Sequence, residues 1–378
     1  MRIGFDGKRA TQNFRGLGNY SRGLIEGLLE FSDEELFLYS SIVKDERALK
    51  WLSDQKKSKL ILREADGAFS KIAPSLWRSF LIINDLKKDK LDLYHGLSHE
   101  IPAGSKELPF KTAVTIHDLI FMRYPEFFPF IDRLTYKKKF SYAGHNADLV
   151  IAICEQTKKD LIEFLGVNEK KIVVHYQSCD PVFYKEGTSD QKKHALEKYK
   201  IQNPFILNVG AFEERKNQLR LIEAFARVSG KIEQDLVLIG NGKKYLEECK
   251  NKSQELNISS RVHFLSNVPL NDLPLLYQSA DLFCFPSHFE GFGLPIVEAL
   301  FSKTPVVTSL GSCFPESAGP DSEYIDPLSI SDISDRIVKV LGDKNLQETM
   351  ITKGLSFVQK FSRENSTKNL LECYSRLF

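Results

Sequence analysis

The chain has 378 residues, 42% of them hydrophobic and 27% charged, which is the balance of a globular protein large enough for two domains. The 52 lysines and arginines nearly cancel the 50 aspartates and glutamates, and the resulting formal charge of +2 argues against a general nucleic-acid binder. Six scattered cysteines form no CxxC pair, so we expect a reducing cytoplasm rather than a zinc or redox site. The charged start MRIGFDGKRA is unlike a signal peptide, and no apolar run is long enough to span a membrane.

The first half of the chain alternates short apolar segments with amphipathic ones. MRIGFDG predicts a strand, and FRGLGNYSRGLIEGLLEF predicts a glycine-containing loop that leads into an amphipathic helix. A helix is expected to end at Gly166. Further strands are expected at 91–96, 111–119, 147–154 and 171–183. Strands that alternate with helices indicate a mostly parallel α/β sheet.

The same alternation begins again after a polar, lysine-rich stretch at 185–200. We place the crossing between the two domains at residues 180–190. A helix is predicted at 217–228 and another over 362–378. Strands are predicted at 204–210, 235–242, 261–268, 281–287 and 304–309. A second α/β domain is therefore expected.

The stretch FPSHFEGFGLPIVEAL places two carboxylates, Glu290 and Glu298, around a glycine-rich turn after an apolar strand. Gly291 and Gly293 permit close backbone approach, and Pro295 suits the first turn of a helix. The N–H groups at a helix start favour an anion such as a phosphate. One carboxylate could hold a sugar and the other a ribose, with a diphosphate between them. The alternative is two solvated surface glutamates.

The stretch VGAFEERKN offers two cations at the turn between a strand and a helix. The strand ends at Gly210, and Arg215 and Lys216 follow before the helix. Adjacent cations can neutralise a diphosphate, whereas cations at a helix start are otherwise disfavoured. The alternative is a pair of solvated side chains.

Three further features are weaker indications of a binding site. Gly16 and Gly18 precede a predicted helix and suit either a tight turn or a phosphate contact. His117 and Asp118 end a strand, where α/β sheets bind their ligands, but a single histidine is often structural. The backbone near Val268 could contact a nucleobase, or it could be an ordinary connection.

Two basic-aromatic segments suit either a lipid surface or the protein core. Residues 75–90 combine apolar side chains with Arg78 and three lysines, and residues 124–142 combine Phe127, Phe128 and Phe130 with Lys137, Lys138 and Lys139. Segments of this composition can lie at a lipid interface.

The motifs together resemble the retaining glycosyltransferases of family 4. EGFGLPIVE resembles the E-x7-E motif of that family, and VGAFEERKN, GLGNY, TIHDL and IVVHYQSCDPVF follow its order and spacing over nearly the whole chain. The chain is most similar to bacterial mannosyl- and rhamnosyltransferases of surface polysaccharide synthesis. The resemblance implies a GT-B fold, two Rossmann-like domains with a cleft between them. It implies an acceptor-binding domain at 1–183, a nucleotide-sugar-binding domain at 184–362, and a final helix at 363–378 that packs back on the first domain.

The resemblance also implies roles for single residues. Glu298 should hold the ribose and Glu290 the donor sugar, with His117 beside that sugar. Arg215 and Lys216 should stabilise the departing diphosphate. The glycine loop with Gly16 and Gly18 should close over the diphosphate, while the turn residues Gly210, Gly291, Phe292, Gly293 and Leu294 should approach sugar or phosphate and Val268 the base. Many relatives have arginine where this chain has Ala211.

The reaction implied by the resemblance moves a hexose, most simply mannose from GDP-mannose, to a hydroxyl of a growing lipid-linked saccharide. No cofactor and no metal are expected, and peripheral contact with the cytoplasmic membrane face is expected. The alternatives are a UDP- or dTDP-sugar donor, a nucleotide-sugar 2-epimerase, a nicotinamide oxidoreductase and a non-catalytic sugar-nucleotide binding module. The oxidoreductase would want GxGxxG directly after the first strand, and RGLGNYS lacks the third glycine.

Overall fold

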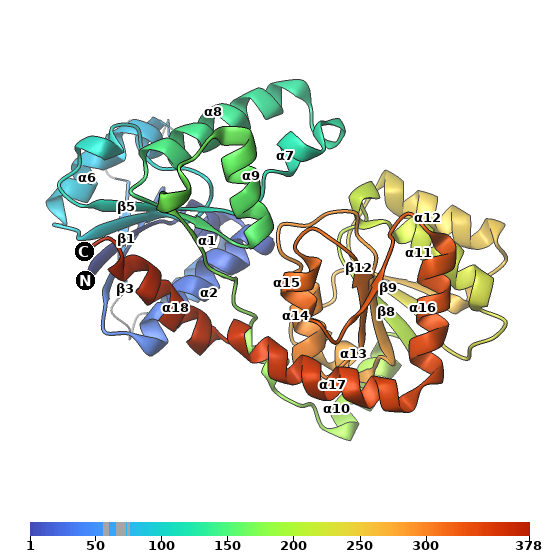
Figure 1. The fold of residues 1–378 in the computed structure, drawn as a ribbon. Helices are drawn as coiled ribbons and strands as arrows, with labels where there is room; N and C mark the ends of the chain where they lie inside the picture. The colour runs from blue at the N-terminus through green and yellow to red at the C-terminus, as the bar shows by residue number, and fades with distance from the viewer. Residues whose placement is uncertain (56–59, 66–72, 74–75) are drawn as a thin grey trace. The chain divides into compact units, whose positions relative to one another are not determined.

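The chain forms two compact α/β units in a computed structural model that describes residues 1–55, 60–65, 73 and 76–378 (Figure 1). Unit 1 comprises Met1–Ser178 and Arg363–Phe378, and unit 2 comprises Cys179–Ser362. The last segment of the chain therefore returns to the unit that the first segment builds.

Unit 1 contains a seven-stranded parallel sheet. Its strands lie in the order β3-β2-β1-β4-β5-β6-β7. They are β1 (Arg2–Asp6), β2 (Glu35–Ser40), β3 (Leu60–Glu64), β4 (Leu93–Gly96), β5 (Lys111–Ile116), β6 (Leu149–Ala152) and β7 (Ile172–Val174). The strand order reverses between the neighbours β1 and β4, so the loops after these two strands diverge at the same edge of the sheet.

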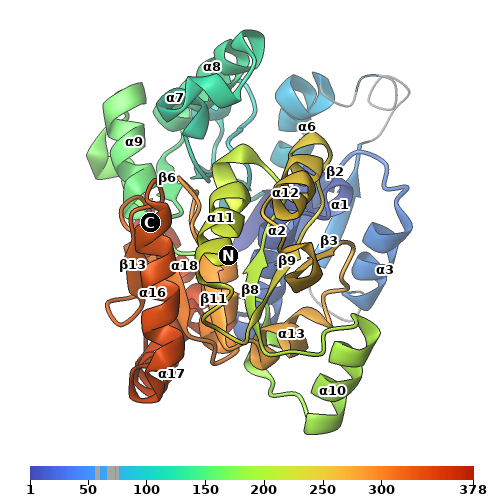
Figure 2. The same ribbon diagram turned by 90° about the vertical axis from the view of Figure 1, so that its right-hand side faces the viewer.

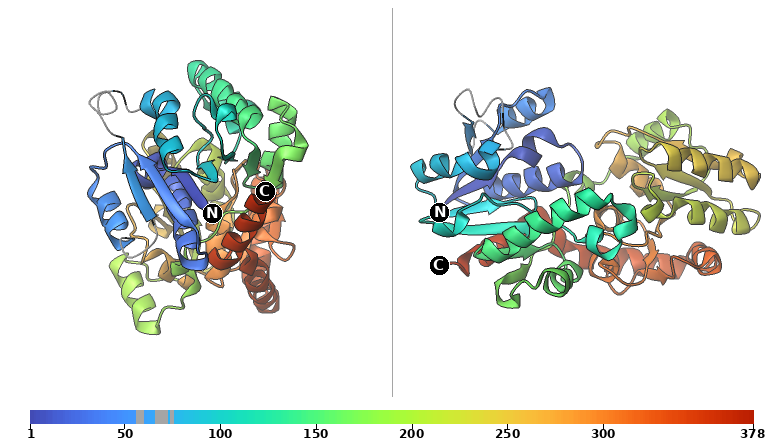
Figure 3. Two further views of the ribbon diagram at one scale, coloured as in Figure 1. Left: turned by 90° about the vertical axis from the view of Figure 1, so that its left-hand side faces the viewer. Right: turned by 90° about the horizontal axis from the view of Figure 1, so that it is seen from above.

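Helices connect the strands of unit 1 and cover its sheet. They are α1 (Lys8–Gln12), α2 (Gly16–Phe31), α3 (Glu46–Asp54), α6 (Ile82–Lys88), α7 (Ile120–Arg123), α8 (Phe130–Asn146), α9 (Glu155–Leu165) and α18 (Arg363–Ser375). Figures 1 and 3 show α18, in red, along α2, in blue, and the two helices pack on each other. Leu370 and Tyr374 of α18 join Leu24 and Leu28 of α2 in one buried apolar cluster.

The expected glycine loop before α2 is wrong. Helix α2 begins at Gly16, so Gly16 and Gly18 both lie in its first turn. A Cβ on Gly18 would overlap the carbonyl oxygen of Asn13, whereas a Cβ on Gly16 would meet nothing within 4 Å. Gly18 therefore allows the start of α2 to pack against the preceding turn, which explains one of the two glycines without a ligand.

Unit 2 repeats the architecture with a six-stranded parallel sheet. Its strands lie in the order β10-β9-β8-β11-β12-β13. They are β8 (Phe205–Val209), β9 (Asp235–Ile239), β10 (Val262–Leu265), β11 (Leu282–Phe285), β12 (Val306–Ser309) and β13 (Glu323–Ile325). Here the order reverses between β8 and β11.

Helices also cover the sheet of unit 2. They are α10 (Ser189–Lys198), α11 (Gln218–Val228), α12 (Lys244–Glu255), α13 (Leu273–Ser279), α14 (Leu294–Phe301), α15 (Phe314–Ala318), α16 (Ile330–Gly342) and α17 (Lys344–Val358). Figure 2 turns this unit toward the viewer, with α11 and α16 in contact. Their apolar faces meet the sheet through fully buried side chains such as Ile222, Phe225, Ile333 and Ile337. Two parallel α/β units confirm the predicted fold class.

The helices show no candidate for a membrane crossing. Among the described residues, no helix is both long enough and apolar enough to span a bilayer.

Candidate active site

The two motifs with the strongest sequence signals meet at the point where the strand order of unit 2 reverses. Strands β8 and β11 are hydrogen-bonded neighbours, with Ile206 opposite Leu282 and Leu207 opposite Phe283. The loop after β8 carries Arg215 and Lys216, and the loop after β11 carries Glu290. Parallel strands point their carboxyl ends to one edge, and ligands of such sheets bind where neighbouring loops diverge. The topology therefore brings these three side chains together.

A short turn aims the two cations at Glu290. Arg215 and Lys216 lie in a 3-10 turn that ends at Asn217, whose φ of 63° is in the left-handed region that asparagine tolerates. The Asn217 side-chain amide donates to the carbonyl oxygens of Pro286 and Pro327 at 3.0 and 2.8 Å. The aliphatic stem of Lys216 lies over Gly210, where a Cβ would stand 3.6 Å from the lysine Cδ. This distance is an ordinary van der Waals contact, so the stem of Lys216 packs over Gly210 without requiring a glycine there.

Glu290 forms ion pairs with both cations. Its Oε2 is 2.8 Å from Arg215 Nη1, and its Oε1 is 2.5 Å from Lys216 Nζ. Arg215 Nη1 also donates to the Phe289 carbonyl oxygen at 2.6 Å. Burial favours the neutral acid, but Lys216 and Arg215 outweigh burial, so the pKa of Glu290 lies below its ordinary value. Glu290 is therefore a carboxylate at neutral pH. Arg215 Nη2 also pairs with Oε2 of the more exposed Glu213 at 3.3 Å, so the two cations stand beside two carboxylates.

Helix α14 begins directly beside this cluster in the chain. Gly293 adopts a φ of 96°, which favours glycine, and a Cβ there would stand 3.1 Å from Ser317 Oγ. Pro295 occupies the first turn, and Leu294 is the first helical residue. Phe292 is buried, and its ring packs edge-on against Phe361 with centroids 5.2 Å apart. Buried packing on one side and a required glycine on the other fix the start of the helix, whose first N–H groups have no partner within the helix itself.

Glu298 lies one turn into α14 and is held differently from Glu290. The Tyr277 hydroxyl donates to its Oε2 at 3.0 Å. Burial raises the pKa of Glu298 to about 7, and the negative charge of Asp180 adds to the rise, while the Tyr277 hydrogen bond partly opposes it. The two carboxylates of the motif therefore differ in protonation: Glu290 is ionised, and Glu298 changes its charge near neutral pH.

Two other residues of unit 2 were predicted to contact the donor, Val268 and Gly291, and the structure places them differently. Val268 is half-buried in the loop after β10, and β9 separates this edge strand from β8. Gly291 is half-buried in the bend between Glu290 and Gly293. Val268 thus follows an edge strand at the carboxyl edge of the sheet and lies outside the Glu290 cluster.

His117 belongs to unit 1, where it follows β5. Its ring is 4% exposed, its Nε2 lies 3.0 Å from the Leu97 carbonyl oxygen, and its Nδ1 lies 3.1 Å from Gln177 Nε2. Burial lowers the pKa of His117 to about 4, against the effect of the Leu97 hydrogen bond. These partners fit a neutral imidazole that donates from Nε2 and accepts at Nδ1. The Tyr20 ring packs edge-on against it with centroids 4.6 Å apart.

Several positioning residues escaped the sequence analysis. Tyr277 and Asp180 set the protonation of Glu298 from 21 residues and more away in the chain, and Gln177 fixes the His117 ring. The segment IVVHYQSCDPVF contains both Gln177 and Asp180, so the resemblance indicated the segment but not the role of either side chain.

Comparisons with known proteins place both units in glycosyltransferases. Residues 189–357 match the family model described as "Glycosyl transferases group 1", and residues 54–182 match the model described as "Glycosyltransferase Family 4". The chain is 27% identical over 394 residues to O-antigen chain mannosyltransferase B of Escherichia coli, with all of both proteins covered. It is 25% identical to the serotype-specific mannosyltransferase WbdA of Escherichia coli over 92% of this chain and 42% of WbdA.

Solved structures agree on the fold. HepE of Anabaena in complex with UDP and glucose superposes with a TM-score of 0.77 at 20% identity, covering all of both chains. A glycosyltransferase from Rickettsia africae superposes with a TM-score of 0.77 at 18% identity, covering 100% of this chain and 98% of the other. Both sheets, the carboxylate motif and these matches lead to one conclusion: the chain is a glycosyltransferase of the GT-B fold that combines a family 4 domain with a group 1 domain.

Proposed function

We propose that this glycosyltransferase moves mannose from GDP-mannose to a hydroxyl group of a growing polysaccharide, with retention at the anomeric carbon. The donor sugar and the acceptor class follow the printed names of the relatives, two of which are mannosyltransferases and one of which acts on O-antigen chains. A UDP- or dTDP-sugar donor is the alternative, because nothing in unit 2 assigns the base. The observation that carries the proposal is the cluster of Arg215, Lys216 and Glu290 where β8 and β11 diverge.

The cluster supplies what a departing nucleoside diphosphate needs. Arg215 and Lys216 together carry two positive charges; both pair with Glu290, and Arg215 also pairs with the exposed Glu213 at 3.3 Å. The two preorganised cations would bind the diphosphate and stabilise the negative charge that grows as the bond to the sugar breaks. Because Glu290 stays ionised, its negative charge would stabilise the positive charge that develops on the sugar ring.

Glu298 would bind the ribose of the donor. A carboxylate accepts two hydrogen bonds and therefore suits the vicinal hydroxyls of a ribose. Tyr277 restrains one of its oxygens at 3.0 Å and leaves the other for the ligand. Binding requires the ionised form, so the pKa of about 7 makes donor binding depend on pH near neutrality.

The proposed step needs no nucleophile from the enzyme. The bond between the anomeric carbon and the phosphate oxygen breaks, and the acceptor oxygen attacks the same face of the sugar. The leaving phosphate takes the proton of the acceptor hydroxyl. A covalent intermediate on Glu290 is the less favoured alternative, because two cations already hold that carboxylate.

A transfer assay tests the proposal. The full chain is incubated with GDP-mannose and α-mannobiose, in parallel with UDP-glucose and a dTDP-sugar, and the product is examined by NMR. We expect a mannosylated product with α-configuration, formed at the same rate with EDTA because Arg215 and Lys216 carry out the charge neutralisation. Transfer from UDP- or dTDP-sugars alone would show that GDP-mannose is not the donor. Consumption of the nucleotide sugar at a rate that does not depend on the acceptor would contradict the proposed transfer reaction.

We further propose that α8 contacts an anionic lipid surface that carries the acceptor. Its apolar side chains Phe130, Ile131 and Leu134 are 64%, 74% and 55% exposed. With the exposed Lys137 and Lys138 they occupy positions i, i+1, i+4, i+7 and i+8, which lie along one face of a helix. Exposed apolar side chains beside lysines fit the boundary of an anionic membrane.

The second predicted membrane segment, 75–90, is divided between core and surface. Trp77 is 3% exposed and donates from its indole nitrogen to Asp85, while Leu76, Phe80 and Leu81 are exposed. Ser75 lies outside the described residues. Helix α8 is therefore the better-supported contact.

Liposome co-sedimentation tests the lipid contact. We expect the wild type to bind vesicles that contain phosphatidylglycerol and to be released by salt, because the lysines contribute electrostatically. The double variant Ile131→Ser, Leu134→Ser should bind less, and Leu49→Ser, which changes an exposed leucine of α3, should bind like the wild type. Equal sedimentation with neutral and anionic vesicles, or no sedimentation with either, would contradict the proposed contact between α8 and an anionic lipid surface.

A further inference from the structure

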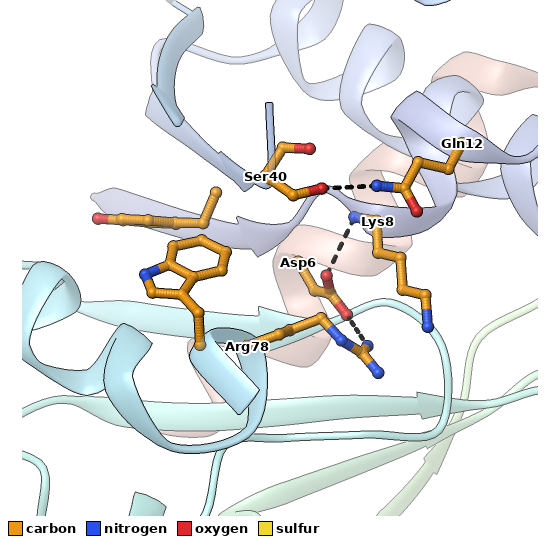
Figure 4. Close-up of a pocket in the computed structure, with 8 residues that line it drawn as sticks. Asp6, Lys8, Gln12, Ser40 and Arg78 are labelled. Carbon is orange, nitrogen blue, oxygen red and sulfur yellow. Dashed lines mark hydrogen bonds and ion pairs between the residues drawn. The ribbon is translucent and has the colours of Figure 1, made fainter. Parts of the chain in front are cut away.

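A polar pocket lies at the carboxyl ends of the neighbouring strands β1 and β2 in unit 1. Its lining residues come from the ends of these two strands, from the segments that follow them and from the short helix Trp77–Leu81, and its volume is about 60 Å3 (Figure 4). Its polar lining comes from Asp6, Lys8, Gln12, Ser40, Ser41 and Arg78. The rings of Tyr39 and Trp77 complete the wall. A pocket of this size takes a few water molecules or the hydroxyl-bearing edge of one sugar ring.

Asp6 is the centre of the pocket. It ends β1 and is 3% exposed, yet it is charged and paired: its Oδ2 lies 2.7 Å from Arg78 Nη1, and its Oδ1 accepts from the backbone N–H of Lys8 at 3.0 Å. Arg78 also pairs with Glu100, which in turn pairs with Lys139 of α8 at 3.0 Å. Ion pairs to two carboxylates fix the guanidinium of Arg78, and Arg78 in turn fixes Asp6 at the base of the pocket.

Lys8 and Gln12 add donors that the protein does not fully use. Lys8 is half-buried and makes no ion pair within the described part of the chain. Burial and the nearby charge of Arg78 lower the pKa of Lys8. The Gln12 amide donates to Ser41 Oγ at 2.6 Å and is itself exposed. Burying a cation without a partner costs free energy, which a ligand that accepts a hydrogen bond from Lys8 would offset.

We propose that this pocket binds the terminal sugar of the acceptor saccharide, with Asp6 accepting from its hydroxyl groups and Lys8 and Gln12 donating to them. The inference rests on the proposed transfer reaction and deepens it. A carboxylate, an ammonium group, an amide and two hydroxyls beside aromatic rings suit a neutral polyhydroxylated ring. A phosphate fits less well, because the carboxylate of Asp6, which lines the pocket, would repel it.

The test compares acceptor and donor constants in three variants of the full chain. The isosteric Asp6→Asn removes the charge of the carboxylate, and Gln12→Ala removes an exposed amide that the fold does not require. The control, Gln254→Ala, changes an exposed glutamine of α12. The probes are α-mannobiose as acceptor and GDP-mannose as donor, with inorganic phosphate as a competitor. Donor affinity is measured by thermal shift and acceptor KM by transfer.

We expect Asp6→Asn to raise the KM for mannobiose about tenfold or more, since it weakens charge-assisted hydrogen bonds, and Gln12→Ala to raise it less. Donor affinity should stay within about twofold of the wild type in both variants, and Gln254→Ala should match the wild type. Unchanged acceptor KM in Asp6→Asn and Gln12→Ala, or competition by phosphate in the wild type that Asp6→Asn strengthens, would overturn the sugar pocket. Failure of the wild type to bind any nucleotide sugar would instead overturn the proposed function.

Discussion

Lys216 and Glu290 act as a pair: the lysine favours the ionised form of the glutamate, and the glutamate positions the lysine. Lys216 contributes to keeping Glu290 ionised, and Glu290 holds the ammonium group 2.5 Å away over the Gly210 turn. Removing either partner leaves a buried charge without its counterpart and removes an electrostatic contact that strengthens as the diphosphate departs. Both side chains should therefore matter more for turnover than for donor binding.

We predict that Glu290→Ala and Lys216→Ala each lower kcat by about 100- to 1000-fold, the range seen when one preorganised donor is removed from a transition state. Lys244→Ala, which changes a lysine 94% exposed on α12, should keep wild-type kcat. Steady-state kinetics with saturating GDP-mannose gives the comparison, and circular dichroism checks the fold. Near-normal turnover in either variant would remove that residue from the mechanism.

Glu298 predicts a pH dependence of donor binding. Its pKa of about 7 in the free protein means that the carboxyl group is mostly protonated at pH 6 and mostly ionised at pH 8. Because ribose hydroxyls donate to the ionised form, donor affinity should rise with pH, by about tenfold from pH 6 to pH 8. Titration calorimetry with GDP-mannose, which has no group of its own near pH 7, measures the slope.

The variant Glu298→Gln provides the control for that slope. Glutamine keeps the shape and can still accept a hydrogen bond, but it does not titrate. Its donor affinity should be lower than that of the wild type at pH 8 and constant between pH 6 and pH 8. A wild-type affinity that does not change with pH would show that Glu298 is not the ribose ligand.

Among the elements, the first turn of α2 offers a matched pair of glycines. A Cβ on Gly18 would overlap the Asn13 carbonyl oxygen, and a Cβ on Gly16 would meet nothing. We predict that Gly18→Ala destabilises the protein by about 1–3 kcal/mol through overpacking. Gly16→Ala should be neutral or stabilising by up to about 1 kcal/mol, because alanine restricts the unfolded chain. Urea unfolding of both variants tests the difference, and equal midpoints would contradict the packing account.

The strands that carry the site could be predicted from the sequence because each is a short apolar run that ends at a turn residue, Gly210 after β8 and Pro286 after β11. Strand β2 escaped prediction because ELFLYS follows α2 after three residues, and a short apolar run cannot be told from helix by periodicity alone. The start of α2 was placed too late because two glycines in five residues resemble a loop. Only the approach of Asn13 to Gly18, a tertiary contact, explains a glycine inside that turn.

The candidate site was predictable in part: the residues that cluster could be predicted, but the side chains that position them could not. Arg215, Lys216 and Glu290 each follow a strand, and the carboxyl ends of parallel strands meet at one edge, so their proximity follows from topology. The hydrogen bond from Tyr277 to Glu298 and the ion pair between Arg78 and Asp6 join segments with no shared pattern. Neither spacing nor composition signals such contacts, since they depend on how helices and turns pack on the sheet.

At the scale of the whole molecule, four buried histidines should limit stability in acid. Burial lowers the pKa of His95 to about 3, of His117 to about 4 and of His175 to about 4, and it lowers that of His99 well below its ordinary value. His95 lies between the Tyr374 hydroxyl of α18 at 2.6 Å and Thr115 Oγ1 at 2.8 Å, so it ties the C-terminal helix to the sheet of unit 1.

A folded pKa below the unfolded value means that the unfolded chain binds more protons, so stability falls as pH drops below about 6.5. Each neutral histidine should contribute a loss of about 1.4 kcal/mol per pH unit between pH 6 and pH 4. The urea midpoint of the wild type should therefore fall steeply from pH 7 to pH 5. His95→Gln should flatten the fall, whereas the exposed His194→Gln should not. A midpoint independent of pH over this range would contradict the account.

The most direct test of the central claim, that Glu298 and the Glu290 cluster hold a nucleotide sugar, is the melting temperature of the full chain with GDP-mannose, UDP-glucose, a dTDP-sugar and NAD. A ligand at 100 times its Kd stabilises the folded protein by about 2.7 kcal/mol. The account predicts a rise in Tm with GDP-mannose that Glu298→Ala abolishes and the exposed Glu255→Ala keeps. A rise with NAD alone, or an equal rise in Glu298→Ala and wild type, would contradict it.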